Sequence, residues 1–302
     1  MITLHFSLRM DMAKKDRRIM KDGFTSVSVL DNFYQTSFYY PMPVVMVTTV
    51  SEKGDTNIGS YSLCFPFGIA GRHSMMLISR CDSNTAVNIR RSGLAALNFI
   101  PYRKDQLANA VRLGYPGQTT EEKLRESMFT LIPSCREQKE DGVRYPGIIK
   151  EAVQVMECTW QDDPKVFNYS GSSEESHFLL IIDKILMKNK WHDALVKGSG
   201  RFPSLPIDYG YRDSKYFWFA GHSKPYREPI PSDKGIDVNS VIYQVQRLPY
   251  DLEWEDAAYE KLVKVPRIFL KRVLESISKR AVESGVKRIT PELLDEYNKK
   301  RR

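Results

Sequence analysis

The residues best suited to chemistry lie between Arg80 and Thr85. Arg80 ends a predicted strand, and Asp82 or Ser83 is well placed to cap a short helix that starts directly after it. The hydroxyls of Ser83 and Thr85, the free N–H groups of a starting helix and the guanidinium would together bind a phosphate or another anion. A capped helix beside an exposed arginine would give the same pattern, so this stretch alone leaves both interpretations open.

A second polar stretch precedes this segment and consists of Asn57, Ser60, Tyr61 and Ser62. We expect it on a strand that runs beside the short helix. Its side chains and amides could bind the carbonyl and N–H edge of a heterocyclic ring. A half-exposed strand whose polar residues face water explains the same residues.

The elements that must position these residues are mostly strands. Apolar and β-branched runs predict strands over 44–50, 56–63, 74–80, 94–100, 153–160, 178–187 and 216–220. A short helix is expected from Asp82 to its stop at Gly93, and another over 120–129. Residues 103–118, 161–176 and 197–215 are expected to be loops. One short helix among many strands predicts a barrel with a helical plug.

Taken together, these stretches resemble the flavin-reductase-like FMN-binding split-barrel family, which includes the flavoredoxins. The resemblance spans residues 27–225 and implies a mainly β fold, a Greek-key antiparallel split β-barrel with short inserted helices, that forms a homodimer. It is carried by Pro43–Val50, Asn57–Ser62, Leu77–Arg80, Asp82, Asn84–Thr85, Asn88–Ile89, Leu97–Phe99, Pro146–Ala152, Met156–Cys158 and His177.

By position, the resemblance implies a set of FMN contacts and one residue near the ring. The expected FMN contacts are Thr48, Asn57, Ser60, Tyr61, Ser62, Arg80, Ser83, Thr85 and Asn88. Arg80, Ser83 and Thr85 would take the phosphate. His177 is the expected catalytic residue, as a hydrogen-bond donor or a nicotinamide contact, although a histidine at a strand start is more often structural.

The loops at 103–118 and 161–176 are longer than is usual in the family. Such loops could cover the flavin and exclude a second flavin or a nicotinamide. Two functions therefore stay open: an NAD(P)H-dependent flavin reductase, and a non-catalytic FMN electron-transfer protein that docks a redox partner. A barrel that has lost its flavin is a third alternative, which the retained polar stretches oppose.

The C-terminal part of the chain is strongly basic. Residues 261–302 hold 13 Lys or Arg and 5 Asp or Glu, whereas the whole chain has a net charge of +8. Apolar residues at helical spacing predict three helices, the last starting at Thr290–Pro291. Residues 252–297 resemble the small C-terminal domain found in light-independent protochlorophyllide reductase, without the cluster-binding cysteines of that enzyme.

A basic helical unit of this kind suits docking to an acidic redox protein or reinforcement of a dimer. Binding to nucleic acid is the rival interpretation and is disfavoured, because interleaved aromatic residues are lacking. The expected domains are an N-terminal arm at 1–26, the split barrel at 27–237, a linker at 238–251 and the basic helical domain at 252–302.

The composition argues against a membrane protein, a secreted protein and a metal-binding protein. No run of about 18 apolar residues predicts a membrane span, and the first residues lack the pattern of a signal peptide. Cys64, Cys81, Cys135 and Cys158 are widely spaced, which argues against a metal site and predicts reduced thiols in a cytoplasmic protein.

Overall fold

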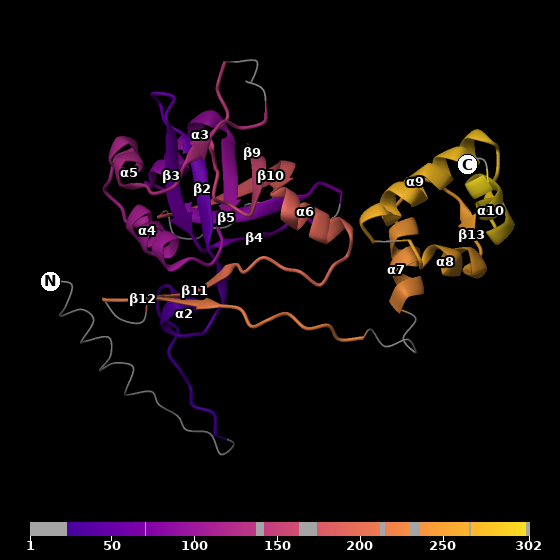
Figure 1. Ribbon diagram of the computed structural model, residues 1–302, viewed down its shortest axis with the longest axis horizontal. Coiled ribbons are helices and arrows are strands. Elements are labelled where there is room, and N and C mark those ends of the chain that lie inside the picture. Colours follow the sequence, from indigo (N-terminus) through magenta and orange to yellow (C-terminus); the bar gives the residue numbers. More distant parts are fainter. Residues whose placement is uncertain are drawn as a thin grey trace. The chain divides into compact units, whose positions relative to one another are not determined.

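A curled, seven-stranded antiparallel sheet is the centre of the first part of the chain (Figure 1). The computed structural model describes residues 23–69, 71–136, 142–162, 174–211, 215–229, 236–265 and 267–299. The strand order is β3-β2-β6-β9-β10-β5-β4. The strands are β2 (Val45–Val50), β3 (Thr56–Tyr61), β4 (Cys64–Pro66), β5 (Ser74–Arg80), β6 (Leu94–Phe99), β9 (Gln154–Gln161) and β10 (Glu175–Met187). The predicted mainly β, split-barrel fold is confirmed.

Both faces of the central strands are buried, which explains their continuous apolar runs. Met46 of β2 packs on one side of the sheet with Ile58 and Ile100. Val45 and Val47 of the same strand pack on the other side, with Phe178 of β10. Alternate side chains of a strand point to opposite faces, so β2 supplies both hydrophobic clusters.

Three helices cover this sheet near its β3 and β5 strands. Helix α3 (Asn84–Ser92) contacts β2, β3, β5 and β6, whereas α4 (Lys104–Gly114) and α5 (Thr120–Glu126) both pack on β3. Ser83 caps α3 by accepting the N–H of Ala86, and Gly93 ends it in the left-handed conformation with φ of +69°. Both ends of α3 were predicted, because the cap residues are explicit in the sequence.

The expectation of a loop over 103–118 was wrong, since α4 occupies most of it. Leu107, Ala110 and Leu113 recur at every third residue and are all buried against the sheet. The many polar residues between them concealed this apolar stripe.

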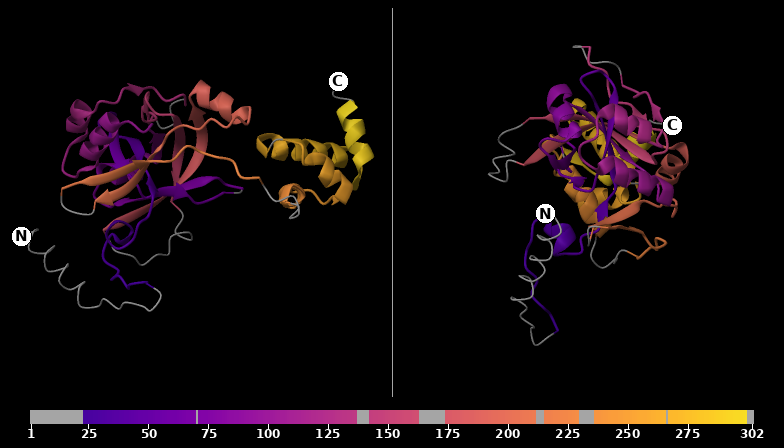
Figure 2. Two further views of the ribbon diagram at one scale, coloured as in Figure 1. Left: turned by 60° about the horizontal axis from the view of Figure 1, so that its bottom comes forward. Right: turned by 90° about the vertical axis from the view of Figure 1, so that its left-hand side faces the viewer.

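A smaller three-stranded sheet lies beside the larger one (Figure 2, left). Its order is β1-β11-β12, from β1 (Met42–Pro43), β11 (Pro206–Tyr211) and β12 (Phe217–Gly221). Strand β11 falls in the region 197–215 that was expected to be a loop, which corrects that expectation. The remaining elements here are α2 (Phe33–Thr36), the β7–β8 pair (Leu131–Ile132 and Ile148–Ile149) and α6 (Asn189–Val196).

The chain divides into two compact units, Met1–Pro225 and Tyr226–Arg302. The second unit contains α7 (Ile236–Val245), α8 (Asp256–Leu262), α9 (Arg267–Glu283) and α10 (Pro291–Lys299), with a parallel pair of β13 (Glu253–Trp254) and β14 (Arg288–Ile289). Its own core includes Val241, Leu262, Leu274 and Leu294. The three helices expected from 252 onward are present.

Residues 238–251, expected to be a linker, contain most of α7 instead. Val241 of this helix is 1 % exposed within the core of the second unit. The second unit therefore begins earlier than position 252. Residues 1–22 of the expected N-terminal arm lie outside the described residues.

None of the helices in the described ranges is long and apolar enough to cross a membrane. Within the same ranges, no group of three or more His, Cys, Asp or Glu side chains is arranged to hold a metal ion. All four cysteines are free thiols. Burial raises the pKa of the Cys64 thiol to about 12, so this side chain acts as a small apolar residue of the core.

Candidate anion pocket and adjoining cavity

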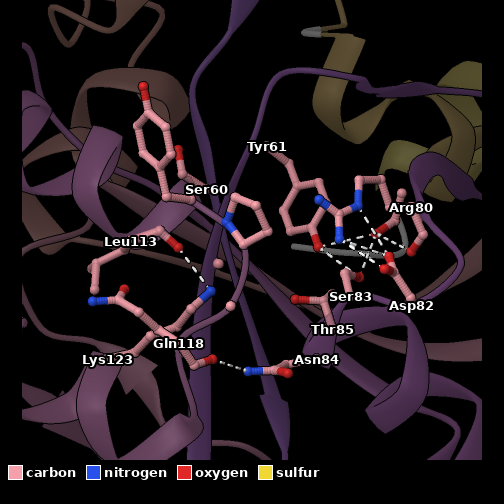
Figure 3. Close-up of a pocket in the computed structure, with 16 residues that line it drawn as sticks. Ser60, Tyr61, Arg80, Asp82, Ser83, Asn84, Thr85, Leu113, Gln118 and Lys123 are labelled. Carbon is pink, nitrogen blue, oxygen red and sulfur yellow. Dashed lines mark hydrogen bonds and ion pairs between the residues drawn. The ribbon is translucent and has the colours of Figure 1, made fainter. Parts of the chain in front are cut away.

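A polar pocket forms where the end of β3, the end of β5, the start of α3 and the α4–α5 connection meet (Figure 3). Its volume is about 130 Å³. Of the nine residues expected to contact FMN, five line this pocket: Ser60, Tyr61, Arg80, Ser83 and Thr85. The fold thus brings the two polar stretches together where β3 contacts α3, as expected from the sequence.

Three hydroxyl groups form a connected chain on the strand side of the pocket. The Ser79 hydroxyl lies 3.0 Å from that of Tyr61 and 2.8 Å from that of Ser83. Ser83 also accepts the N–H of Ala86 at 3.0 Å. The N-cap hydroxyl is therefore held in place at the positive end of α3, where an anion is favoured.

Arg80 supplies a cation at the rim of the pocket. Its guanidinium contacts the Asp82 carboxylate, with an Nη2–Oδ1 distance of 2.8 Å and an Nε–Oδ1 distance of 3.0 Å. The two side chains are 54 % and 68 % exposed. An ion pair this exposed contributes only about 0–1 kcal/mol, so a ligand anion can replace Asp82 at Arg80 with little loss.

Lys123 lines the opposite side of the pocket, on α5 (Figure 3). The residue is 8 % exposed, and its ammonium donates to the carbonyl of Leu113 at 2.9 Å. Burial lowers the pKa of this ammonium below its ordinary value. Lys123 was not among the residues expected at the site, since a lysine on a short polar helix is normally solvated.

Gly59 allows β3 and α3 to approach closely. A Cβ at this position would lie 2.9 Å from the Thr85 hydroxyl and 2.9 Å from the Tyr61 ring. Thr85 is 2 % exposed, so it has little room to move away. A residue without a side chain is therefore needed where the two polar stretches meet.

A larger cavity of about 560 Å³ adjoins the anion pocket and shares Ser60, Arg80 and the turn at Gly114–Pro116 with it. This volume lies within the usual range for small-molecule sites. Its other walls come from α2, α4 and the small sheet, and they include several aromatic side chains. The aromatic residues that line it are Tyr115, Tyr211, Tyr216, Phe217 and Phe219.

Ser62 and Asp208 face each other in this larger cavity. The Ser62 hydroxyl donates to Asp208 Oδ2, and the N–H of Gly210 donates to Oδ1 at 2.6 Å. Asp208 is 3 % exposed, and its burial raises the pKa of the carboxyl despite these two hydrogen bonds. The sequence offered no signal for Asp208, which comes from a segment expected to be a loop.

Four of the residues predicted to form the site line neither cavity. Thr48 is buried and accepts a hydrogen bond from Asn98 at 3.3 Å, whereas Asn88 donates to Thr49 at 3.1 Å. Asn57 lies just behind the pocket, where its side-chain oxygen Oδ1 accepts hydrogen bonds from the side chains of Asn84 and Thr120. His177 pairs with Ile78 across the β10–β5 ladder.

Asn88 therefore joins α3 to β2, whereas Thr48 joins β2 to β6, so both residues act in the core of the first unit. Buried polar groups of this kind stabilise a fold when they are hydrogen-bonded to each other. The side-chain N–H₂ of Asn57 is buried without a partner among the described residues, so Asn57 keeps an unused donor close to the pocket.

No protein-family model and no curated protein matches the sequence. Solved structures do match in fold. The 2-nitrobenzoate 2-nitroreductase of Pseudomonas fluorescens is 16 % identical with a TM-score of 0.52, and the match covers 71 % of this chain and 96 % of that one. A flavoredoxin from Methanosarcina acetivorans is 13 % identical with a TM-score of 0.50, over 70 % and 98 % of the two chains.

Component B of nitrilotriacetate monooxygenase from Bacillus cereus is 17 % identical with a TM-score of 0.51, and the match covers 70 % of this chain and 98 % of that one. At such identities the likeness shows the fold and leaves the site to be argued from its own residues. The first unit thus has the split-barrel fold that it shares with these three structures.

Proposed function

We propose that the first unit binds FMN and works as an oxidoreductase. The observation that carries the proposal is the direct connection between a small anion pocket and a larger cavity lined by aromatic residues. FMN has the same two parts, a phosphate and an extended ring system. The names of the neighbours, a nitroreductase, a flavoredoxin and a monooxygenase component, support a redox role.

The residues of the two cavities fit this cofactor. Ser83, Thr85 and Arg80 offer two hydroxyls and a cation at the start of α3, which suits the phosphate. Ser60 and Ser62 line the larger cavity and would hold the polar edge of the ring system. Tyr61 would support this arrangement through its hydroxyl contact with Ser79.

When bound, FMN would supply the hydride or electron transfer, and the protein would supply position, electrostatics and exclusion of water. The Ser62–Asp208 pair places an exchangeable proton inside the cavity. His177 is the catalytic residue that the resemblance implies. It lies on β10, so it would act on the flavin only if its side chain reached the ring system from that strand.

NAD(P)H is the proposed electron donor, which makes the protein a flavin reductase or a related flavoprotein reductase. The test is an anaerobic visible spectrum of the protein reconstituted with FMN, before and after NADH or NADPH. A reductase bleaches the flavin band with one nucleotide within seconds to minutes. If dithionite bleaches the flavin and neither nucleotide does, the proposed donor is wrong.

A non-catalytic electron carrier is the second candidate. The basic second unit favours it, because exposed cations such as Arg272 and Lys264 could dock an acidic redox protein. Lys271 and Lys279 of the same unit already lie near Glu275 and Glu283, at 3.8 and 3.9 Å. A carrier would pass electrons from reduced flavin to an acidic redox protein, at a rate that falls as salt is added.

The first unit is also proposed to form a homodimer. Tyr115 and Tyr216, at the larger cavity, are 57 % and 62 % exposed. Aromatic side chains exposed around a cavity are typical of surfaces that a ligand or a second copy of the chain covers. Light scattering on the purified protein gives the mass that decides between a monomer and a dimer.

A further inference from the structure

Lys123 differs from the other cation of the anion pocket in lacking a carboxylate. Arg80 has Asp82 beside it, whereas no ion pair joins Lys123 to an acidic group in the part of the chain that the structure describes. The Leu113 carbonyl takes one of the three ammonium protons. A charge buried with one neutral partner is costly to the fold, unless a ligand compensates it.

The position of Lys123 indicates that this ligand is an anion. The ammonium lies beneath the α4–α5 connection and points into the pocket, across from Thr85 and the start of α3 (Figure 3). An anion between them would meet hydroxyls and a helix N-terminus on one side and a cation on the other. A neutral ligand would leave the ammonium as poorly compensated as before.

We propose that Lys123 is the buried counter-ion of the ligand's phosphate and makes the site selective for FMN over riboflavin. The identity of the ligand rests on the proposed function, whereas the need of Lys123 for an anion does not. The terminal hydroxyl of riboflavin carries no charge to offset the ammonium. Hydrogen bonds between charged partners are about twice as strong as neutral ones, so the phosphate is favoured at this position.

The first experiment compares flavin affinities of the Lys123→Met variant and the wild-type protein by fluorescence titration. We expect the wild type to bind FMN at least tenfold more tightly than riboflavin. In Lys123→Met, FMN affinity falls by about tenfold or more and riboflavin affinity does not fall, so the two constants converge. Lys123→Arg, which keeps the charge, retains part of the preference.

The matched control is Lys53→Met. Lys53 is a second cation beside α5, where it contacts Glu121 at 2.6 Å, but its side chain is 74 % exposed. We expect this variant to keep the wild-type ratio of FMN to riboflavin affinity. If FMN affinity fell equally in both lysine variants, the overall positive charge of this region, and not the buried ammonium, would set the preference for FMN over riboflavin. That result would overturn the proposal.

A second experiment uses inorganic phosphate as the probe and needs no flavin. In the full-length wild-type protein, phosphate should raise the melting temperature of the first unit, and in Lys123→Met it should leave that temperature unchanged. In phosphate-free buffer Lys123→Met should melt no lower than the wild type, since it removes an uncompensated charge.

The outcomes separate the two proposals. A phosphate effect that depends on Lys123 in a protein that binds no flavin would sink the FMN proposal and keep the anion site. Flavin binding with equal affinities for FMN and riboflavin in the wild type would overturn the role of Lys123 and keep the flavin. The wild-type measurements decide this even if the methionine variant fails to fold.

Discussion

At the scale of single residues, the site depends on a few side chains in unusual surroundings. Gly59 stands where a Cβ would strike both Thr85 and Tyr61. Lys123 is buried beside the turn at Gly114–Pro116, with the Leu113 carbonyl as its hydrogen-bond acceptor. At Gly59 a side chain would have no room, whereas at Lys123 the charge matters for the proposed ligand and not for the fold.

Gly59→Ala tests the close approach of β3 and α3. We predict that it destabilises the first unit by about 1–3 kcal/mol, the usual cost of overpacking. It should also weaken FMN binding, because Thr85 and Tyr61 must shift. Urea unfolding and flavin titration measure the two effects. Gly200→Ala is the control, since a Cβ there meets nothing within 4 Å, and a similar loss in that variant would contradict the explanation.

Much of the residue-level site could be predicted from the sequence. Ser83 and Gly93 mark the ends of α3 by their types alone, and the strand before α3 brings Arg80 to the same place. Lys123 and Asp208 could not be predicted, because both residue types are normally exposed and only tertiary packing buries them. Thr48 and Asn88 were expected in the site, but they face Asn98 and Thr49 in the core.

At the scale of elements, the larger cavity depends on contact between two sheets. Ser62 follows β3 of the large sheet, and Asp208 belongs to β11 of the small one. Their hydrogen bond joins the two sheets at the cavity. Strand β11 is short and follows a polar region, so its existence depends on pairing with β1 and β12, which no local pattern indicates.

Asp208→Asn tests this connection through the pH dependence of stability. Burial raises the folded-state pKa of Asp208 above its unfolded value, so the folded state favours the protonated carboxyl. Its contribution is therefore present below the unfolded pKa and is lost as the pH rises through the folded pKa. We predict that Asp208→Asn does not lose stability as the pH rises through this range. The variant should therefore be at least as stable as the wild type at neutral pH.

Urea unfolding of both proteins across the acidic range measures that difference. An amide can still bond Ser62 and the N–H of Gly210, so the fold should be kept. A variant that is less stable than the wild type at neutral pH but equally stable at acidic pH would show that the carboxylate charge itself holds the two sheets together, contrary to this explanation.

At the scale of the whole molecule, the chain consists of two units with separate cores. The first is centred on residues such as Val47 and Leu97, and the second on Leu262 and Leu274. The change of charge along the sequence indicated this division, whereas α7 was missed because residues 238–251 follow a segment rich in proline.

Two separate cores predict two unfolding transitions, only one of which responds to FMN. FMN at about 100 times its dissociation constant should stabilise the first unit by about 2.7 kcal/mol. The transition of the second unit should stay where it is. Calorimetry with and without FMN measures both. A single transition that moves as a whole would show that the units unfold together and would contradict their independence.

The most direct test of the central claim is a calorimetric titration of the flavin-free protein with FMN. We predict one FMN per chain, with a dissociation constant in the micromolar range or below and a loss of affinity when phosphate is added as a competitor. The absence of binding at millimolar FMN would contradict the claim that the connected pocket and cavity form a flavin site.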